Sequence, residues 1–324
     1  MKTKGFIIAA VILIAAGLIV FCVAGAQCQG DLSKLSTGGY ETTVHSLSDS
    51  FLHFDIDTDT ADIRLVPSID GNCRVECYEQ AKMRHDVSVQ SDTLVIQMED
   101  RRAWYDYIGF HLESPIIRIY LPLEQYGALS ISASTGDITI PEEFTFESID
   151  VNISTGDIYC SASASGRIYG KTSTGDIRME NSSAQSIELS TTTGMMLLTN
   201  VYCTEELSLN ITTGDTKITN TSCTYFSSTG DTGDLHMQSL HASHSTDIER
   251  STGDVIFDLL SCPNVVITTD TGDVEGRLVD NAIFDVESNT GHIDIPPSRL
   301  YGKCKIRTDT GDVKITVYHP IFNP

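Results

Sequence analysis

The stretch Ser132-Ala-Ser-Thr-Gly-Asp-Ile-Thr-Ile140 contains the first of ten copies of a Thr-Gly motif, which Asp usually follows. Successive copies are separated by 19 or 20 residues. A repeat of this period is typical of a solenoid or a repeat array. A degenerate earlier copy is Thr60-Ala-Asp-Ile63. The ten threonines are Thr135, Thr155, Thr174, Thr193, Thr213, Thr232, Thr252, Thr271, Thr290 and Thr310.

Apolar residues alternate with polar ones on both sides of each Thr-Gly. Examples are Ile149, Val151 and Ile153 before the copy at Thr155, and Val255 and Phe257 after the copy at Thr252. This alternation predicts a half-buried strand on each side of the motif. Gly permits a positive φ at a sharp corner between the strands. Each repeat is therefore predicted to be a strand, a corner, a second strand and a return.

Two architectures fit this unit. Each repeat is either an antiparallel hairpin with Thr-Gly at its tip or one coil of a β-solenoid. The near-constant repeat length favours the solenoid, because every coil must close on the same perimeter. We predict an all-β, single-chain β-solenoid (parallel β-helix) of about ten 19–20-residue coils over residues 124–318, with a tail over 319–324. Within residues 51–123, apolar and polar residues alternate over several short stretches, which are predicted to be strands. These strands are predicted to form an N-terminal β cap over the first coil.

The corner residues are the ones we expect to stack into files along the rod. An Asp beside a corner Gly is placed to accept hydrogen bonds from nearby amides, so each Asp is predicted to cap its own corner without a metal. A row of weak Ca²⁺ sites is the alternative. Met195 and His292 replace the Asp in two copies. The predicted corner residues are Gly136, Asp137, Gly156, Asp157, Gly175, Asp176, Gly214, Asp215, Gly233, Asp234, Gly253, Asp254, Gly272, Asp273, Gly311 and Asp312. One coil is irregular, with Ser228 and Gly230 where apolar residues are expected.

The N-terminal residues point to a membrane. An uncharged apolar run from Gly5 to Ala26 follows Lys2 and Lys4. About 20 apolar residues span a bilayer as a helix, and the preceding lysines favour a cytoplasmic N-terminus. We predict a cytoplasmic segment over 1–4, a transmembrane signal-anchor helix over 5–26 and a polar extracellular stalk over 27–50. The alternative is secretion after cleavage near Ala26.

Charge and motifs exclude several functions. The 324-residue chain has a net charge of −23, which repels phosphate backbones and excludes nucleic-acid binding. Its nine cysteines are too sparse for a disulfide scaffold. There is no Cys-x-x-Cys and no paired Cys/His spacing, so we predict no zinc site and no cofactor. No Gly-x-Ser-x-Gly, phosphate loop or His-Glu-x-x-His occurs, so we predict no catalytic residues and a protein that is not an enzyme.

One segment of the predicted cap is a candidate contact loop. It concentrates the single Trp and several other aromatic residues beside two arginines. Trp, Tyr and Arg dominate the energetics of protein interfaces. The alternative is that these aromatic residues fill the interior of the cap. The loop residues are Arg101, Arg102, Trp104, Tyr105 and Tyr107.

The apolar N-terminal run, the strand ending Ile119-Tyr-Leu-Pro122 and the serial Thr-Gly-Asp repeats resemble a bacterial family of β-strand-repeat proteins labelled "putative adhesin", a domain of unknown function. Related domains occur in cell-envelope stress-response proteins. The resemblance implies a membrane-anchored, extracellular, adhesin-like binding or structural module at the bacterial envelope. It also implies a cell-envelope protein or glycan as partner, and a role in envelope-stress sensing. The alternative is a polysaccharide-active β-helix enzyme, a lyase or hydrolase.

Overall fold

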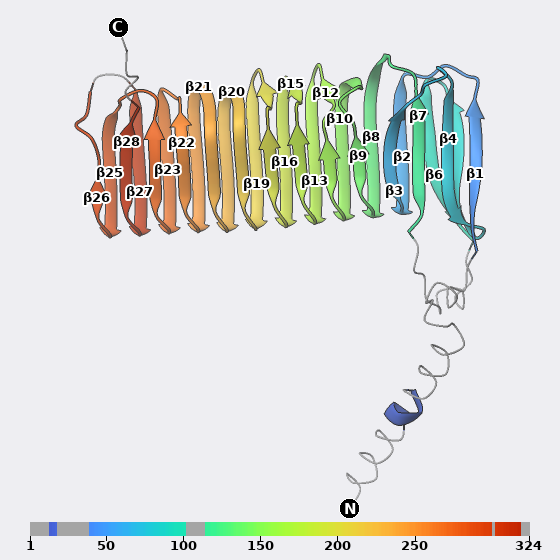
Figure 1. Cartoon of the computed structure of the whole chain (residues 1–324), viewed down its shortest axis with the longest axis horizontal. Coiled ribbons are helices and arrows are strands. Elements are labelled where there is room, and N and C mark those ends of the chain that lie inside the picture. Colours follow the sequence, from blue (N-terminus) through green and yellow to red (C-terminus); the bar gives the residue numbers. More distant parts are fainter. Residues whose placement is uncertain (1–12, 18–38, 102–113, 300–301, 319–324) are drawn as a thin grey trace, which may run out of the picture.

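The computed structural model describes residues 13–17, 39–101, 114–299 and 302–318. Stacked strands form one long rod (Figure 1). Three consecutive coils carry three strands each, as in β13 (Arg167–Thr174), β14 (Ile177–Glu180) and β15 (Ser183–Ala184), whereas other coils have two strands or longer continuous ones. Equivalent strands of neighbouring coils pair in parallel; Ile168 lies opposite Ile187 of the next coil. The molecule is therefore an all-β solenoid of about nine turns, which the ten Thr-Gly corners delimit.

The hairpin alternative is excluded by the strands on either side of Gly156. β10 (Thr145–Thr155) pairs with β8 (Gln125–Thr135) and β13, whereas β11 (Ile158–Cys160) pairs with β9 (Ile138–Ile140) and β14. The solenoid prediction for these coils is confirmed. The remaining solenoid strands are β12 (Ser163–Ala164), β16 (Ser186–Thr193), β17 (Met196–Thr199), β18 (Tyr202–Cys203), β19 (Glu206–Thr213), β20 (Thr216–Thr232), β21 (Leu235–Thr252), β22 (Val255–Leu260), β23 (Asn264–Thr271), β24 (Val274–Leu278), β25 (Ile283–Thr290), β26 (Ile293–Asp294), β27 (Lys303–Thr310) and β28 (Val313–Val317).

The core is a continuous apolar column inside the coils. Ile149, Val151 and Ile153 are buried, while the residues between them, Asp150 and Asn152, are exposed. Because side chains alternate across a strand, every coil contributes the same inward positions to this column. The predicted period-two pattern is therefore the pattern of burial.

The N-terminal end is partly solenoid rather than a separate cap. β2 (His53–Thr60) and β3 (Asp62–Pro67) pair in parallel with β8 and β9, and Thr60 lies opposite Thr135. The degenerate motif Thr60-Ala-Asp-Ile63 is thus a true corner. β6 (Thr93–Asp100) and β7 (Ile116–Leu121) form a further parallel layer on β2 and β3.

Antiparallel strands close this end of the rod. β5 (Met83–Gln90) pairs with β6, and β4 (Cys73–Gln80) pairs with both β7 and β1 (Tyr40–Leu47). This group of strands beyond β2 and β3 is called the cap below. β1 lies within residues 27–50, so the prediction of a stalk throughout that range is wrong for 40–47. The Tyr40 ring stacks on Tyr78, with 5.0 Å between ring centroids, which ties β1 to β4.

The last two coils are stacked in the reverse of their sequence order. β27 lies between β23 and β25, and β28 lies between β24 and β26 (Figure 1, red and orange strands). Lys314 consequently lies between Glu275 and Asp294, with its Nζ 2.6 Å from Glu275 Oε1. In sequence order the two carboxylates would be direct neighbours and would repel each other. Charge pairing therefore favours the reversed order.

The irregular coil accommodates a buried arginine. Arg250 points inward with only 3% of its surface exposed. Its Nη2 donates to Ser228 Oγ at 2.9 Å, and a Cβ on Gly230 would lie 2.8 Å from its Nη1. Burial lowers the pKa of Arg250 to about 10. Ser228 and Gly230 are thus small because the guanidinium of the next coil occupies the space that apolar side chains fill elsewhere.

Residues 13–17 are helical, and among the described residues no helix is long and apolar enough to cross a membrane. Most of the predicted anchor, Gly5 to Ala26, lies outside the described residues.

Candidate functional site

The corner glycines approach one another too closely for any side chain. All ten glycines of the Thr-Gly motifs have φ between 127° and 157°, a region that residues with a Cβ rarely adopt. A Cβ on Gly156 would lie 2.2 Å from the carbonyl oxygen of Gly136 in the neighbouring coil. The Gly156 amide donates to Thr174 O at 2.9 Å, which joins the corner to the coil on its other side. The repeat therefore requires Gly at this position for both conformation and space.

The aspartates after these glycines form a ladder that links successive coils. Asp157 N donates to Asp137 Oδ1 at 2.9 Å, and Asp176 N donates to Asp157 Oδ1 at 2.7 Å. The prediction that each Asp caps its own corner is wrong, because the donating amide belongs to the neighbouring coil. Five more bonds of this kind, at 2.7–3.1 Å, belong to the ladder. Their donor amides and acceptor carboxylates are Asp137 to Asp62, Asp234 to Asp215, Asp254 to Asp234, Asp273 to Asp254, and Asp312 to Asp273.

The two copies without Asp interrupt the ladder in different ways. Met195 N still donates to Asp176 Oδ1 at 2.8 Å, but its side chain offers no carboxylate to the amide of Asp215. The ladder is therefore broken at this coil. His292 lies in the terminal coil, where its amide donates to Asp312 Oδ1 at 2.7 Å. Among the described residues no further coil stacks on this one, so replacing Asp at this position removes no ladder bond.

A second ladder, of asparagines, was missed by the sequence analysis. Asn181, Asn200 and Asn220 stack at another corner with φ of 54°, 55° and 48°. Asn200 Nδ2 donates to Asn181 Oδ1 at 2.9 Å, and Asn220 Nδ2 donates to Asn200 Oδ1 at 2.7 Å. The signal was available: each Asn follows the Thr of its own Thr-Gly motif by seven residues.

The candidate contact loop joins β6 to β7 at the position that a Thr-Gly corner occupies in other coils. Asp62 N donates to Pro115 O at 2.9 Å, in place of the Asp carboxylate that accepts the equivalent amide hydrogen bond in coils such as that of Asp157. Arg101 is exposed and pairs with Glu99. The other predicted loop residues, Arg102, Trp104, Tyr105 and Tyr107, lie outside the described residues.

Open grooves cross the outer faces of the rod. One of about 330 Å³ lies over Gly230 and is lined by Asp231, Glu249 and Asp270. Within the described part of the chain, these carboxylates do not form a trio with ligand atoms within 4.8 Å of one another. The groove is acidic but is not a preformed metal site.

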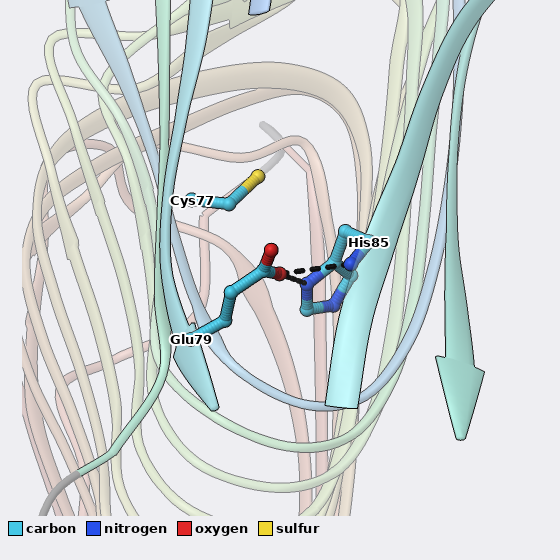
Figure 2. A group of neighbouring side chains, drawn as sticks. All are labelled: Cys77, Glu79 and His85. Carbon is cyan, nitrogen blue, oxygen red and sulfur yellow. Dashed lines mark hydrogen bonds and ion pairs between the residues drawn. The ribbon is translucent and has the colours of Figure 1, made fainter. Parts of the chain in front are cut away.

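A buried polar cluster lies in the cap. Cys77 and Glu79 alternate along β4 and so face the same side, and the turn Ala81-Lys82 brings His85 of β5 against them (Figure 2). The three residues are 0%, 2% and 4% exposed. One ligand atom from each lies within 4.8 Å of the others. Glu79 Oε2 accepts a hydrogen bond from the His85 backbone amide at 2.8 Å and is also 2.8 Å from Nδ1.

The cluster leaves one strong acceptor without a partner. Glu79 Oε1 is fully buried and accepts no hydrogen bond. Figure 2 shows it on the side of the carboxylate that faces the Cys77 sulfur. Burial, with the nearby Glu79 charge, raises the pKa of the Cys77 thiol to about 12. A thiol, a carboxylate and an imidazole together are the donor types that zinc takes in proteins.

Cys/His spacing did not reveal this cluster, because its ligands come from alternate residues of one strand and from the strand after the turn. Cys-x-x-Cys and paired Cys/His spacings place ligands on turns and helices, and this cluster has neither spacing. The relevant pattern is Cys77-x-Glu79 before a tight hairpin, with His85 in the returning strand.

The stacked parallel coils and the corner ladders define a β-solenoid repeat protein. A family model described as Toastrack DUF4097 matches residues 51–260 and again residues 202–320. The chain belongs to this family, which agrees with the resemblance to a domain of unknown function. No curated protein gives a significant match to the sequence.

Comparison with solved structures finds matches of low similarity, among them the three that follow. A "putative adhesin" from Bacteroides fragilis is 13% identical, with 85% of this chain and 97% of that chain covered and a TM-score of 0.40. One from Parabacteroides merdae is 10% identical, with coverage of 84% and 97% and a TM-score of 0.41. One from Parabacteroides distasonis is 13% identical, with coverage of 84% and 98% and a TM-score of 0.37. These scores are too low to support an argument about function.

Proposed function

We propose that this chain is an adhesin-like binding or structural module at the outside of the bacterial cell envelope. The observation that carries the proposal is the uninterrupted rod. About nine turns at ~4.8 Å each give a length of roughly 45 Å, and every turn presents the same outward positions. Solenoids commonly use such extended faces to bind other macromolecules.

The outward positions carry groups that suit a polar partner. Along the face formed by β8, β10, β13, β16 and β19, side chains at one outward position align coil after coil. They supply hydroxyl, amide and amine groups, which hydrogen-bond to glycans and to protein backbones. The aligned residues are Ser132, Asn152, Lys171, Ser190 and Asn210.

Attachment through Gly5 to Ala26 is part of the proposal. The apolar length and the preceding lysines support a single-pass anchor with the solenoid outside the cell. Secretion after cleavage near Ala26 is the alternative. A role in envelope-stress sensing rests only on the resemblance to envelope stress-response proteins. Deleting the gene and measuring induction of an envelope-stress reporter tests that role.

The binding role is tested by displaying the full chain on a non-adherent bacterial host. We expect more cells to be retained on immobilised envelope glycan or envelope protein than with host cells that lack the chain. A triple variant, Trp104→Ala, Tyr105→Ala and Tyr107→Ala, asks whether the contact loop contributes. Retention equal to that of empty host cells on every envelope preparation contradicts the proposal.

The acidic groove over Gly230 is the observation that favours the second candidate, a polysaccharide-active enzyme. Glycosidases use paired carboxylates, and Asp231, Glu249 and Asp270 line this groove. Incubation with acidic and neutral polysaccharides, followed by measurement of new chain ends, tests this function. Activity that disappears in Asp270→Asn, while the variant keeps its melting temperature, would replace the binding module with an enzyme.

A further inference from the structure

The Cys77, Glu79 and His85 cluster has no role in the rod or its outer faces. A buried carboxylate oxygen without a hydrogen bond is unfavourable, so native proteins rarely keep one. Glu79 Oε1 is such an atom, and the Cys77 sulfur lies beside it (Figure 2). We propose that Cys77, Glu79 and His85 bind a zinc ion that fixes the β4–β5 hairpin in the cap.

The geometry needs only small adjustments to hold the ion. Zinc–ligand distances of about 2.0–2.3 Å in a tetrahedral site place the ligand atoms about 3.3–3.6 Å apart. In the cluster they already lie within 4.8 Å of one another. Glu79 offers the unbonded Oε1. His85 Nδ1, now 2.8 Å from Glu79 Oε2, exchanges that hydrogen bond for the metal.

Charge balance favours a divalent ion in this buried position. Zinc binding displaces the thiol proton of Cys77, because a metal-bound thiol is deprotonated. The thiolate and the Glu79 carboxylate then carry two negative charges, which neutralise Zn²⁺. A neutral complex is much less costly to bury than an isolated carboxylate.

Thr58 supplies the outer support that zinc-binding histidines usually have. Its Oγ1 lies 2.8 Å from His85 Nε2. When Nε2 carries the ring proton and donates it to this hydroxyl, Nδ1 is left with the lone pair that binds the metal. Thr58 is therefore a positioning residue. It lies on β2, a strand that pairs in parallel with the solenoid strand β8.

An ion can reach the cluster through the hairpin turn. Ala81 and Lys82 are exposed, whereas Glu79 and His85 lie only a short distance along the strands on either side. Opening of this two-residue turn exposes the cluster without unstacking the solenoid. Zinc then joins two strands of the cap, so binding should stabilise the cap against unfolding.

The test uses the full chain, purified without a histidine tag and stripped of metal. We expect one Zn²⁺ per chain to be retained against a weak chelator and to raise the melting temperature. With Co²⁺ as the probe, we expect a thiolate-to-cobalt charge-transfer band in the near ultraviolet and the visible bands of a tetrahedral ion. A chain that retains no zinc, or a Co²⁺ complex without the thiolate band, overturns the proposal whether or not any variant folds.

Variants identify the ligands. Cys77→Ser and His85→Gln should abolish the Co²⁺ band and the zinc-induced rise in melting temperature. Thr58→Val should weaken zinc affinity ~10–100-fold while keeping the band. The control is Cys160→Ser, which changes an equally buried thiol in the solenoid and should leave both readouts intact. A band that persists in Cys77→Ser, or disappears equally in Cys160→Ser, contradicts the assignment.

Discussion

The carboxylate of Asp157 accepts a hydrogen bond from the backbone amide of Asp176, one coil further along the rod, at 2.7 Å. This bond crosses between coils and does not close its own corner. An intramolecular hydrogen bond contributes about 1 kcal/mol net, and somewhat more when one partner is charged. Repetition along the stack makes the ladder a sum of such contributions, each of which can be removed or added separately.

The break at Met195 can be repaired. Met195→Asp places a carboxylate where the amide of Asp215 needs an acceptor, so we expect the free energy of unfolding to rise by about 0.5–1.5 kcal/mol. Urea denaturation measures this change. The matched control is His292→Asp, which adds the same side chain to the terminal coil, where the described part of the chain offers no further corner amide to donate to it. Equal stabilisation by both variants would refute the ladder as the cause.

Calcium should have little effect on the ladder, because the Oδ1 atoms already accept amide hydrogen bonds. We expect the melting temperature of the chain, with its zinc content held constant, to change by no more than a few degrees between a calcium chelator and millimolar Ca²⁺. A large rise with Ca²⁺ that is lost in Asp254→Asn and Asp273→Asn would show instead that the file is a row of calcium sites.

Gly156→Ala should be among the most damaging small substitutions in the rod. Its Cβ would lie 2.2 Å from Gly136 O, and φ is 133°. We expect a loss of at least ~3 kcal/mol, because strain and backbone overlap add together. Gly71→Ala separates the two causes, since Gly71 also has a positive φ, 71°, but has no atoms within 4 Å of the added Cβ. Its cost should be only about 1 kcal/mol.

Removing the buried guanidinium should not destabilise the solenoid. Arg250 Nε has no partner, and the hydrogen bonds of its guanidinium within the described ranges go to a backbone carbonyl and a hydroxyl rather than to a carboxylate. Arg250→Met keeps most of the apolar stem and removes the charge, so we expect a neutral effect or a gain of about 1–3 kcal/mol. Urea denaturation provides the measurement. A loss above 1 kcal/mol would mean that the bonds to Ser228 Oγ and Glu249 O outweigh the desolvation of the charge.

Much of the architecture could be predicted from periodicity. The spacing of the Thr-Gly copies and the parity of the flanking apolar residues determine the coil length and the inward face. Even the degenerate copy at Thr60 is a true coil. The order of coils could not be read in this way, because the repeat period constrains each coil and not its neighbours. The reversed order places Lys314 between Glu275 and Asp294, a charge pairing that the repeat pattern does not encode.

The candidate sites show the same difference between features that a local motif predicts and contacts that depend on the three-dimensional fold. The corner glycines and aspartates were predicted from the motif, although the bonding partner of each Asp was not, because that partner lies in another coil. The Asn181 ladder had a visible signal and was overlooked. The cap cluster depends on a tight hairpin that places His85 against Glu79, and the intrusion of Arg250 opposite Gly230 depends on stacking. Both are contacts that no local pattern specifies.

The central claim, a solenoid held outside the cell by an N-terminal anchor, is tested most directly by labelling intact bacteria that produce the full chain. Lys171 and Lys217 are exposed on the solenoid and can react with a membrane-impermeant amine reagent. We expect both lysines to be labelled on intact cells, in a chain recovered from the membrane fraction. Labelling only after lysis would contradict an extracellular solenoid, and a soluble chain beginning at Gln27 in the medium would contradict the anchor.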